Sequence, residues 1–158
     1  PAGPLREPVA AGMKRADVVL SIGTHKAQTG FKQAWGNQVT RPHVQGYLQP
    51  LETGMDWTGT PVLAFAGIGY PEKFFNTLRR LGATLLQNHA LDDHQPLTPS
   101  LLARLDMDAK RLGAQLVTTE KDAVRLPVDY RHRVLTLPVR LELADWSEID
   151  ALLEARGL

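Results

Sequence analysis

The sequence contains no cysteine among its 158 residues. This absence excludes a disulfide-stabilised scaffold, a thiolate zinc site and a cysteine nucleophile, and it fits a reducing compartment. The sequence also lacks any apolar run that approaches the roughly 20 residues of a membrane-spanning helix. We therefore expect a protein that is soluble or lies at the periphery of a membrane.

An excess of charge of one sign is absent as well. The chain carries 18 Lys and Arg against 17 Asp and Glu, without a long run of either sign. Nucleic-acid binding normally requires a basic patch or stripe, so nucleic acid is not an expected partner. The chain begins at Pro1 within PAGPLREP, a segment that resembles the interior of a protein, and we expect the sequence to be a piece of a longer polypeptide.

Patterns typical of strands and helices alternate from residue 61 to the end of the chain. Residues 61–67, PVLAFAG, are apolar throughout, as expected for a strand covered on both faces. Residues 71–81 and 98–113 place apolar side chains at helical spacing, with a proline near the start and a glycine at the end of each pattern. This alternation predicts an α/β fold in which helices cover both faces of a mostly parallel sheet, giving three layers.

The first 60 residues are less regular. Residues 9–16 and 17–22 predict a short helix and a strand. Residues 37–51 contain β-branched and aromatic side chains interrupted by Pro42 and Gly46, which predicts edge strands and not a central strand. At the other end of the chain, residues 132–139, HRVLTLPV, predict one final strand.

Three polar segments follow predicted strands, at the edge of a parallel sheet where ligands usually bind. The first is the glycine turn GIG at 67–69. A phosphate-binding role for this turn lacks its usual signatures, because the chain contains neither GxxxxGK[ST] nor GxGxxG. The pattern favours a tight turn in which glycine lets strand and helix pack closely.

The second segment, NHALDDHQPLT at 88–98, contains His89, Asp92, Asp93 and His94. Three interpretations are open: a solvated polar loop, an acid/base pair in which a carboxylate orients a histidine, and a metal site with imidazole and carboxylate ligands. The letters alone do not decide among them.

The third segment is TTEKD at 118–122. Thr119 is positioned to cap a short helix, with Asp122 three residues later as a weak capping box. Lys121 stands where it could meet an anion, but it is also spaced to be a helix-surface neighbour of Arg125.

Four blocks in this order, PAGPLREP, AFAGIGYPEKFF, DDHQPLT and LVTTEKDAVRLP, resemble the tetraacyldisaccharide 4'-kinase family, the lipid A kinases of Gram-negative bacteria. The resemblance covers most of the chain and is weakest between Gly23 and Gly54. It implies transfer of the ATP γ-phosphate, with Mg²⁺, to the 4'-hydroxyl of a tetraacyldisaccharide 1-phosphate at the cytoplasmic face of the inner membrane.

In this family the larger N-terminal half supplies the phosphate loop, the magnesium-binding acids and the peripheral membrane contact, so ATP and Mg²⁺ bind mainly there. The resemblance therefore implies that this chain is a C-terminal part, soluble and inactive alone, whose partners are the N-terminal half and the lipid disaccharide. It implies a remnant of the kinase domain at 1–35, a β linker at 36–60 and a C-terminal α/β domain at 61–158.

The resemblance also assigns site residues. His94 matches a loop histidine thought to pair with an aspartate of the N-terminal half that accepts the proton of the sugar hydroxyl, and Asp93 matches the acid before it; these are the predicted catalytic residues. Arg6 and Glu7 match a block near the nucleotide side of the cleft, and Lys121 and Asp122 match TEKDA, for which the resemblance implies only a place in the cleft lining. Arg6, Glu7 and Lys121 are the predicted cofactor-binding residues, and no metal ligand is predicted. The sequence departs from the family at Gln95, where a second histidine is usual.

A different class of function stays open beside the kinase. The same loops could belong to a non-catalytic α/β module that binds a nucleotide or another anion.

Overall fold

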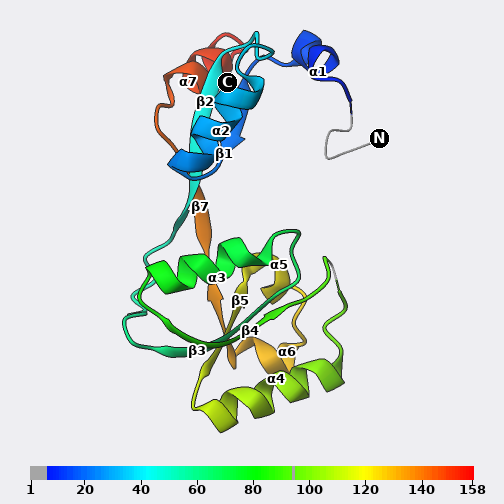
Figure 1. Ribbon diagram of the computed structural model, residues 1–158, viewed down its shortest axis with the longest axis vertical. Coiled ribbons are helices and arrows are strands. Elements are labelled where there is room, and N and C mark those ends of the chain that lie inside the picture. Colours follow the sequence, from blue (N-terminus) through cyan, green and yellow to red (C-terminus); the bar gives the residue numbers. More distant parts are fainter. Residues whose placement is uncertain (1–6, 94) are drawn as a thin grey trace. The chain divides into compact units, whose positions relative to one another are not determined.

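The computed structural model describes residues 7–93 and 95–158 (Figure 1). Its internal contacts define two compact units. The first comprises the chain up to Gln49 together with Arg140–Leu158, and the second comprises Pro50–Val139. The predicted division at residues 35 and 60 concerned the relation to a longer kinase, and it stays a prediction.

The second unit is built on a parallel sheet of four strands in the order β4-β3-β5-β6 (Figure 1). Its strands are β3 (Pro61–Ala66), β4 (Thr84–Ala90), β5 (Gln115–Thr119) and β6 (Val134–Leu137). Its helices are α3 (Pro71–Arg80), α4 (Pro99–Leu112), α5 (Glu120–Ala123) and α6 (Val128–Arg131). The predicted α/β fold with a parallel sheet is confirmed.

Strand β3 carries the core because both of its faces are covered. Val62, Ala64 and Ala66 pack in one cluster with Phe75 and Leu78 of α3. The alternate residues of the strand, Leu63 and Phe65, pack in a second cluster with Leu102 and Leu105 of α4. Two clusters on opposite faces of one strand confirm the predicted arrangement of helix, sheet and helix.

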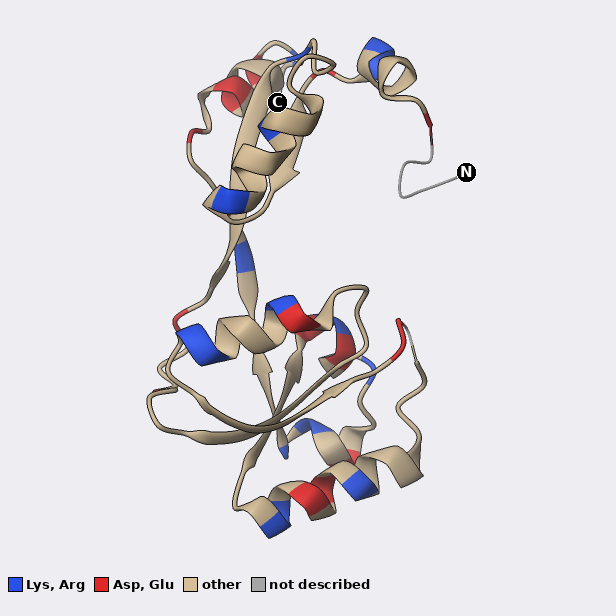
Figure 2. Ribbon diagram, viewed as in Figure 1, with Lys and Arg blue, Asp and Glu red and all other residues tan. Residues whose placement is uncertain are grey.

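Helix α4 presents a charged surface opposite its buried face. Lys110 Nζ lies 2.8 Å from Asp106 Oδ2, and Arg111 Nη2 lies 3.1 Å from Asp108 Oδ1. Figure 2 shows these acidic and basic residues following one another along the helix. Such pairs one helical turn apart support the helix locally but contribute little to global stability.

The first unit contains a sheet of three strands in the order β1-β2-β7, of which β1 and β2 are parallel. The strands are β1 (Val19–Ile22), β2 (His43–Pro50) and β7 (Val139–Leu143). The helices are α1 (Val9–Arg15), α2 (His25–Trp35) and α7 (Ser147–Glu154). Among the residues the structure describes, no helix is long and apolar enough to cross a membrane.

The prediction of an edge strand at 37–51 was wrong, because β2 is the middle strand of its sheet. Pro42 precedes β2 and does not interrupt it. A side chain at Gly46 would lie within 2.9 Å of Leu141 Cδ1 and Leu143 Cδ2, so the glycine gives these leucines their space. Both residues are therefore compatible with a central position.

The single final strand predicted at 132–139 is two strands, β6 and β7, which belong to different sheets. Pro138 separates them, since proline has no N–H to continue a ladder. Its carbonyl accepts a hydrogen bond from Leu51 N at 2.9 Å, and the next amide, Val139 N, donates to Glu120 Oε2 at 3.0 Å.

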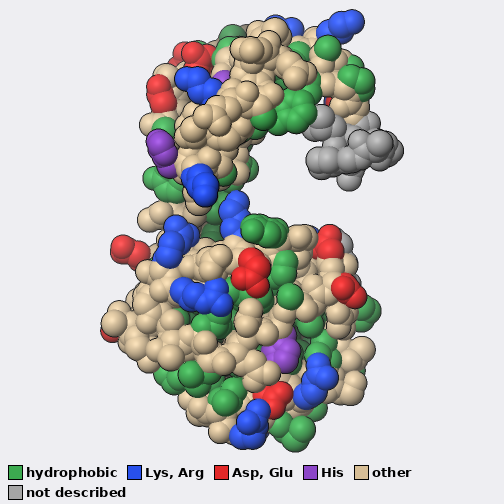
Figure 3. Space-filling model, in the orientation of Figure 1, with side chains coloured by type: hydrophobic (Ala, Val, Ile, Leu, Met, Phe, Trp, Pro, Cys, Tyr) green, Lys and Arg blue, Asp and Glu red, His purple; other side chains and the backbone are tan. Residues whose placement is uncertain are grey.

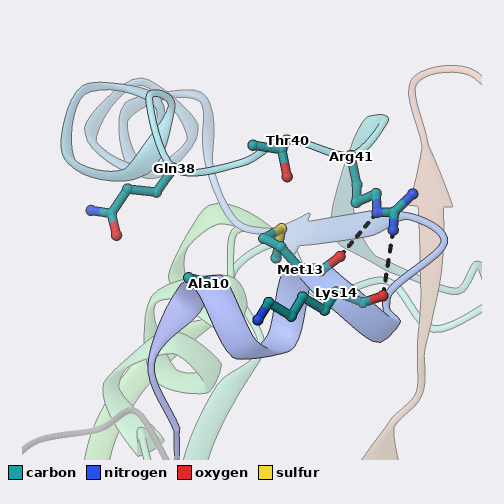
Figure 4. Close-up of a pocket in the computed structure, with 6 residues that line it drawn as sticks. All are labelled: Ala10, Met13, Lys14, Gln38, Thr40 and Arg41. Carbon is teal, nitrogen blue, oxygen red and sulfur yellow. Dashed lines mark hydrogen bonds between the residues drawn. The ribbon is translucent and has the colours of Figure 1, made fainter.

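Arg41 ties the end of α1 to the rest of the first unit. Its Nε donates to the carbonyl of Met13 at 2.9 Å and its Nη2 to that of Lys14 at 3.4 Å (Figure 4). These carbonyls belong to the last turn of α1, where helix hydrogen bonds are unmade and a cation is favourable. A shallow hollow beside this contact is lined by Ala10, Met13, Lys14, Gln38, Thr40 and Arg41.

Gln28 of α2 is the polar centre of the first unit, and only 7% of it is exposed. Its Nε2 donates to the carbonyls of Ser21, at 2.9 Å, and Gly46, at 3.2 Å. Its Oε1 accepts from Ser21 Oγ at 2.5 Å, and Ser21 Oγ lies 2.7 Å from His43 Nε2. Because Ser21 donates its single proton to Gln28, the ring nitrogen of His43 donates to Ser21. The arrangement is structural and does not form a nucleophile and base.

Replacing Gln28 with Leu should destabilise the first unit by about 1–3 kcal/mol, since three hydrogen bonds between α2, β1 and β2 are lost inside it. Amide hydrogen exchange of β1 and β2 measures the change. Gln33→Leu is the matched control, because Gln33 lies on the same helix and is exposed. Equal exchange rates in both variants would contradict the role given to Gln28.

Candidate functional site

The three polar segments singled out in the sequence meet at the carboxyl edge of the second sheet. Residues 67–69 follow β3, residues 91–98 follow β4, and α5 follows β5 directly. Gly67 N donates to Asp122 Oδ2 at 3.0 Å, and Leu91 N donates to the carbonyl of Ala66 at 2.9 Å. The ends of three strands are thus joined, as the parallel topology predicts.

Asp122 is the centre of this edge, and its side chain is completely buried. Its Oδ2 accepts from Gly67 N and also from Thr119 Oγ1 at 2.8 Å. Its Oδ1 accepts from Arg125 Nη1 at 3.0 Å. A carboxylate away from water is tolerated only with such partners, and one cation and two neutral donors serve here.

The cap predicted at Thr119 is confirmed, because Thr119 Oγ1 accepts from Asp122 N at 3.2 Å. The second hydrogen bond of a capping box, from the N-cap backbone N–H to the side chain three residues later, is replaced by another contact. The Asp122 carboxylate does not accept from the backbone of its own helix start but reaches Gly67, 55 residues away in the chain. The buried environment makes this longer-range contact available.

The glycine turn at 67–69 acts in packing. Its first amide is already donated to the Asp122 carboxylate, so it does not point at an open ligand site. A side chain at Gly67 would lie 3.2 Å from both Asp122 Oδ1 and the carbonyl oxygen of Asp92. The glycine lets the loop after β4 approach the end of β3, and a buried anion at this place opposes the binding of phosphate.

The loop after β4 contains a closed turn. Gln95 N donates to the carbonyl of Asp92 at 2.9 Å, and Asp92 N donates to Gln95 Oε1 at 3.0 Å. Arg125 Nη2 donates to the carbonyl of Gln95. Thr98 Oγ1 then caps α4 by accepting from Leu101 N at 3.3 Å. The segment is anchored on both sides of its acidic residues.

Two of the predicted site residues are brought together. Lys121 Nζ lies 3.5 Å from Asp93 Oδ1, with 49% and 51% of the two side chains exposed. The predicted alternative, in which Lys121 neighbours Arg125 on a helix surface, does not describe Arg125, which turns inward to Asp122. Asp93 and Lys121 thus present one negative and one positive group to solvent beside the buried Asp122.

The other predicted site residues lie elsewhere. His94 and Arg6 are outside the described residues. Glu7 belongs to the first unit, where Arg15 Nη1 and Nη2 donate to its two carboxylate oxygens at 2.6 and 2.5 Å. These hydrogen bonds lower the pKa of Glu7. The roles assigned to the five residues stay predictions.

His89 lies inside β4 and not in the loop where the sequence grouped it. Its Nε2 accepts a hydrogen bond of 2.9 Å from Gln87 Nε2, which suits the neutral ring. Burial lowers the pKa of His89, the Arg104 cation lowers it further, and the Asp108 carboxylate opposes the shift. Among residues 7–93 and 95–158, no three histidine or acidic side chains gather as metal ligands would.

Comparison with known proteins gives the family. A protein-family model described as Tetraacyldisaccharide-1-P 4'-kinase matches residues 1–157. The chain belongs to the tetraacyldisaccharide 4'-kinase family. This result confirms the resemblance drawn from the four sequence blocks.

Curated relatives named tetraacyldisaccharide 4'-kinase are similar to most of this chain. The relative from Jannaschia sp. (strain CCS1) is 60% identical over 154 residues, and that from Dinoroseobacter shibae is 59% identical over 155 residues. Each match covers 98% of this chain but only 47% and 46% of the relative, so the chain spans about half the length of these proteins. No solved structure matches the chain.

Sequence reasoning missed two contributors to the edge in this kinase-family chain. Arg125 was considered only as a possible helix-surface neighbour of Lys121, although its spacing of three residues from Asp122 is itself a signal for an ion pair. Thr118 is completely buried, and its Oγ1 donates to the carbonyl of Phe65 at 2.8 Å. No local sequence pattern predicts this hydrogen bond, because its two partners are 53 residues apart.

Replacing Asp122 with Asn should lower the free energy of unfolding of the second unit by about 2–3 kcal/mol, because Arg125 loses its counter-charge and the new amide group meets existing donors. Urea denaturation measures the loss. Asp108→Asn, which removes a carboxylate from the surface of α4, should cost less than about 1 kcal/mol. Equal losses in the two variants would contradict the central place of Asp122.

The low pKa of His89 predicts a pH effect on stability. The unfolded chain takes up a proton near the ordinary value of 6.5, whereas folded His89 resists protonation, so its contribution to stability is lost as the pH falls below 6.5. The stability of His89→Gln relative to the parent should therefore increase when the pH is lowered from 7.5 to 5. Urea midpoints of both proteins at the two pH values measure this change. A difference that is the same at both pH values would refute this.

Proposed function

We propose that this chain is the C-terminal part of a lipid A kinase that transfers the ATP γ-phosphate to the 4'-hydroxyl of tetraacyldisaccharide 1-phosphate. The membership of the family and the coverage of about half of each relative support this assignment. The observation that carries it is the carboxyl edge of the second sheet, where the exposed Asp93 and Lys121 lie beside the buried and fully hydrogen-bonded Asp122.

Phosphoryl transfer requires a cradle for the phosphates, a metal ion and a group that orients the attacking hydroxyl. The described residues of the edge do not fit the first two roles, because the Gly67 amide is bonded to a carboxylate and no metal-ligand group is formed. In this proposal ATP and Mg²⁺ bind mainly to the remaining half of the kinase, as the family resemblance implies. This chain supplies Asp93 and His94 for orienting the acceptor hydroxyl.

Lys121 completes the wall of the cleft on this side. Its ammonium group lies near Asp93, where it holds the carboxylate in place and offers a positive charge to an approaching phosphate. Arg6 and Glu7 serve the nucleotide side, in keeping with their position in the family's motif. A chain with only the acceptor-orienting group lacks most of the catalytic machinery and is inactive alone.

The proposed partners follow from this reaction. They are the lipid disaccharide and the remaining half of the kinase, and the assembled enzyme acts at the cytoplasmic face of the inner membrane, with the other half making the peripheral contact. On the face seen in Figure 3, charged side chains of both signs are scattered over the second unit and form no single basic patch. That nucleic acid is not a partner stays an expectation from the composition of the chain.

A chimera tests the proposal: this chain replaces the matching 154 residues of the relative from Jannaschia, which is the positive control. We expect the chimera to phosphorylate the disaccharide with MgATP, because both sides of the cleft are present, and the isolated chain to show no transfer. Transfer by the isolated chain, or an inactive chimera beside an active relative, would contradict the proposal.

Calorimetry of the isolated chain with MgATP tests the alternative class of function, a non-catalytic nucleotide-binding module. We expect no binding, because the glycine turn offers no free cradle. Tight binding of ATP would support a non-catalytic nucleotide-binding module instead.

A further inference from the structure

Asp122 and Arg125 link the ends of β3 and β5 to the loop that carries Asp93. We propose that these two residues are positioning residues for the transfer reaction, acting through the carbonyl of Gln95 without touching substrate. The inference rests on the proposed function, because it assigns a task to the loop in that reaction. The link itself is a property of this chain and can be tested without catalysis.

The link begins at the Asp122 carboxylate, which is the anchor of the loop. The Asp122 carboxylate is wholly buried and accepts from Gly67 N at 3.0 Å and from Thr119 Oγ1 at 2.8 Å. Gly67 follows the central strand β3 and Thr119 ends β5. The carboxylate is therefore bonded to residues at the ends of two strands of the sheet.

The second step transfers this fixed position to the loop. Arg125 donates from Nη1 to Asp122 Oδ1 at 3.0 Å and from Nη2 to the carbonyl of Gln95. Because the guanidinium group is planar and rigid, the orientation of one contact fixes the direction of the other. Arg125 is 26% exposed, so much of this bridge is shielded from competing water.

The third step fixes Asp93. The segment is closed by two hydrogen bonds between Asp92 and Gln95 and is tied to the sheet where Leu91 N donates to the carbonyl of Ala66. Lys121, the residue before Asp122, reaches Asp93 Oδ1 at 3.5 Å. Asp92 and Gln95 are thus bonded to each other, and the Asp93 side chain lies close to a group from the same short helix as Asp122.

This arrangement matters for transfer because orienting an acceptor hydroxyl depends on placement to within about 1 Å, and a misplacement of that size can cost on the order of 100-fold in rate. Removing the guanidinium group should loosen the loop. It also leaves the buried Asp122 carboxylate with two neutral donors, Gly67 N and Thr119 Oγ1, and without its counter-charge, so a loss of stability is expected together with the loosening.

Nuclear magnetic resonance of the isolated chain tests the link directly, by comparing Arg125→Gln with the parent. We expect the amide signals of Asp93 and Gln95 to shift or broaden, and the Gly67 amide, still bonded to Asp122, to stay near its parental position and report that the unit is folded. Unchanged Asp93 and Gln95 signals would overturn the proposal.

The chain offers a matched control. Arg131 is an exposed arginine of the same unit whose Nε, like the Arg125 guanidinium, donates to a backbone carbonyl, that of Leu126, at 3.1 Å. Arg131→Gln removes the same kind of group and should leave the loop signals unchanged; loop changes as large as those of Arg125→Gln would overturn the proposal. Should Arg125→Gln fail to fold, Arg125→Lys keeps the charge but cannot span both contacts, and the same loop changes are expected.

Kinetics of the chimera supply the second arm. Arg125→Gln should lower kcat by about 10- to 100-fold, with the KM for ATP unchanged because ATP binds to the other half. Arg131→Gln should lower the melting temperature without lowering kcat. The proposal is overturned if Arg125→Gln keeps parental kcat, or if kcat in both variants falls in proportion to the melting temperature.

The two proposals fail in different ways. An inactive parental chimera beside an active relative contradicts the kinase assignment, and the loop signals of the isolated chain still decide whether Asp122 and Arg125 position Asp93.

Discussion

The burial of one carboxylate organises the second unit. Asp122 has no contact with solvent, and its charge is tolerated because Gly67, Thr119 and Arg125 all donate to it. A buried charge whose partners come from separate strands acts as a constraint, since displacing any partner exposes the others to an unfavourable environment. The glycine turn, the short helix and the loop after β4 are held in register by this requirement.

The edge of the sheet therefore contains two kinds of side chain, those that are buried around Asp122 and those that are exposed to solvent. The buried residues are fully bonded among themselves, whereas Asp93 and Lys121 remain half-exposed beside them. This division is typical of sites in which one set of side chains meets the ligand and a second set fixes their geometry.

The sequence predicted what depends on local periodicity and on the rules of parallel sheets. The apolar strand 61–67 and the two capped helices gave the fold, and the carboxyl-edge rule placed the three polar segments together. The errors arose where a distant neighbour decides. Gly46 lies in a central strand, where Leu141 and Leu143 occupy the space that a side chain would need. The Asp122 carboxylate accepts a hydrogen bond from Gly67, 55 residues away in the chain. Neither contact can be predicted from the residues adjacent in the sequence.

The hydrogen bond between Leu51 and Pro138 joins the two points at which the chain enters and leaves the second unit. A continuous segment whose two ends are hydrogen-bonded to each other closes on itself, so the second unit is formed from one uninterrupted stretch of the chain. The first unit, by contrast, draws on residues from both sides of this segment, so its three-stranded sheet combines β1 and β2 with β7, a strand that follows most of the second unit in the sequence.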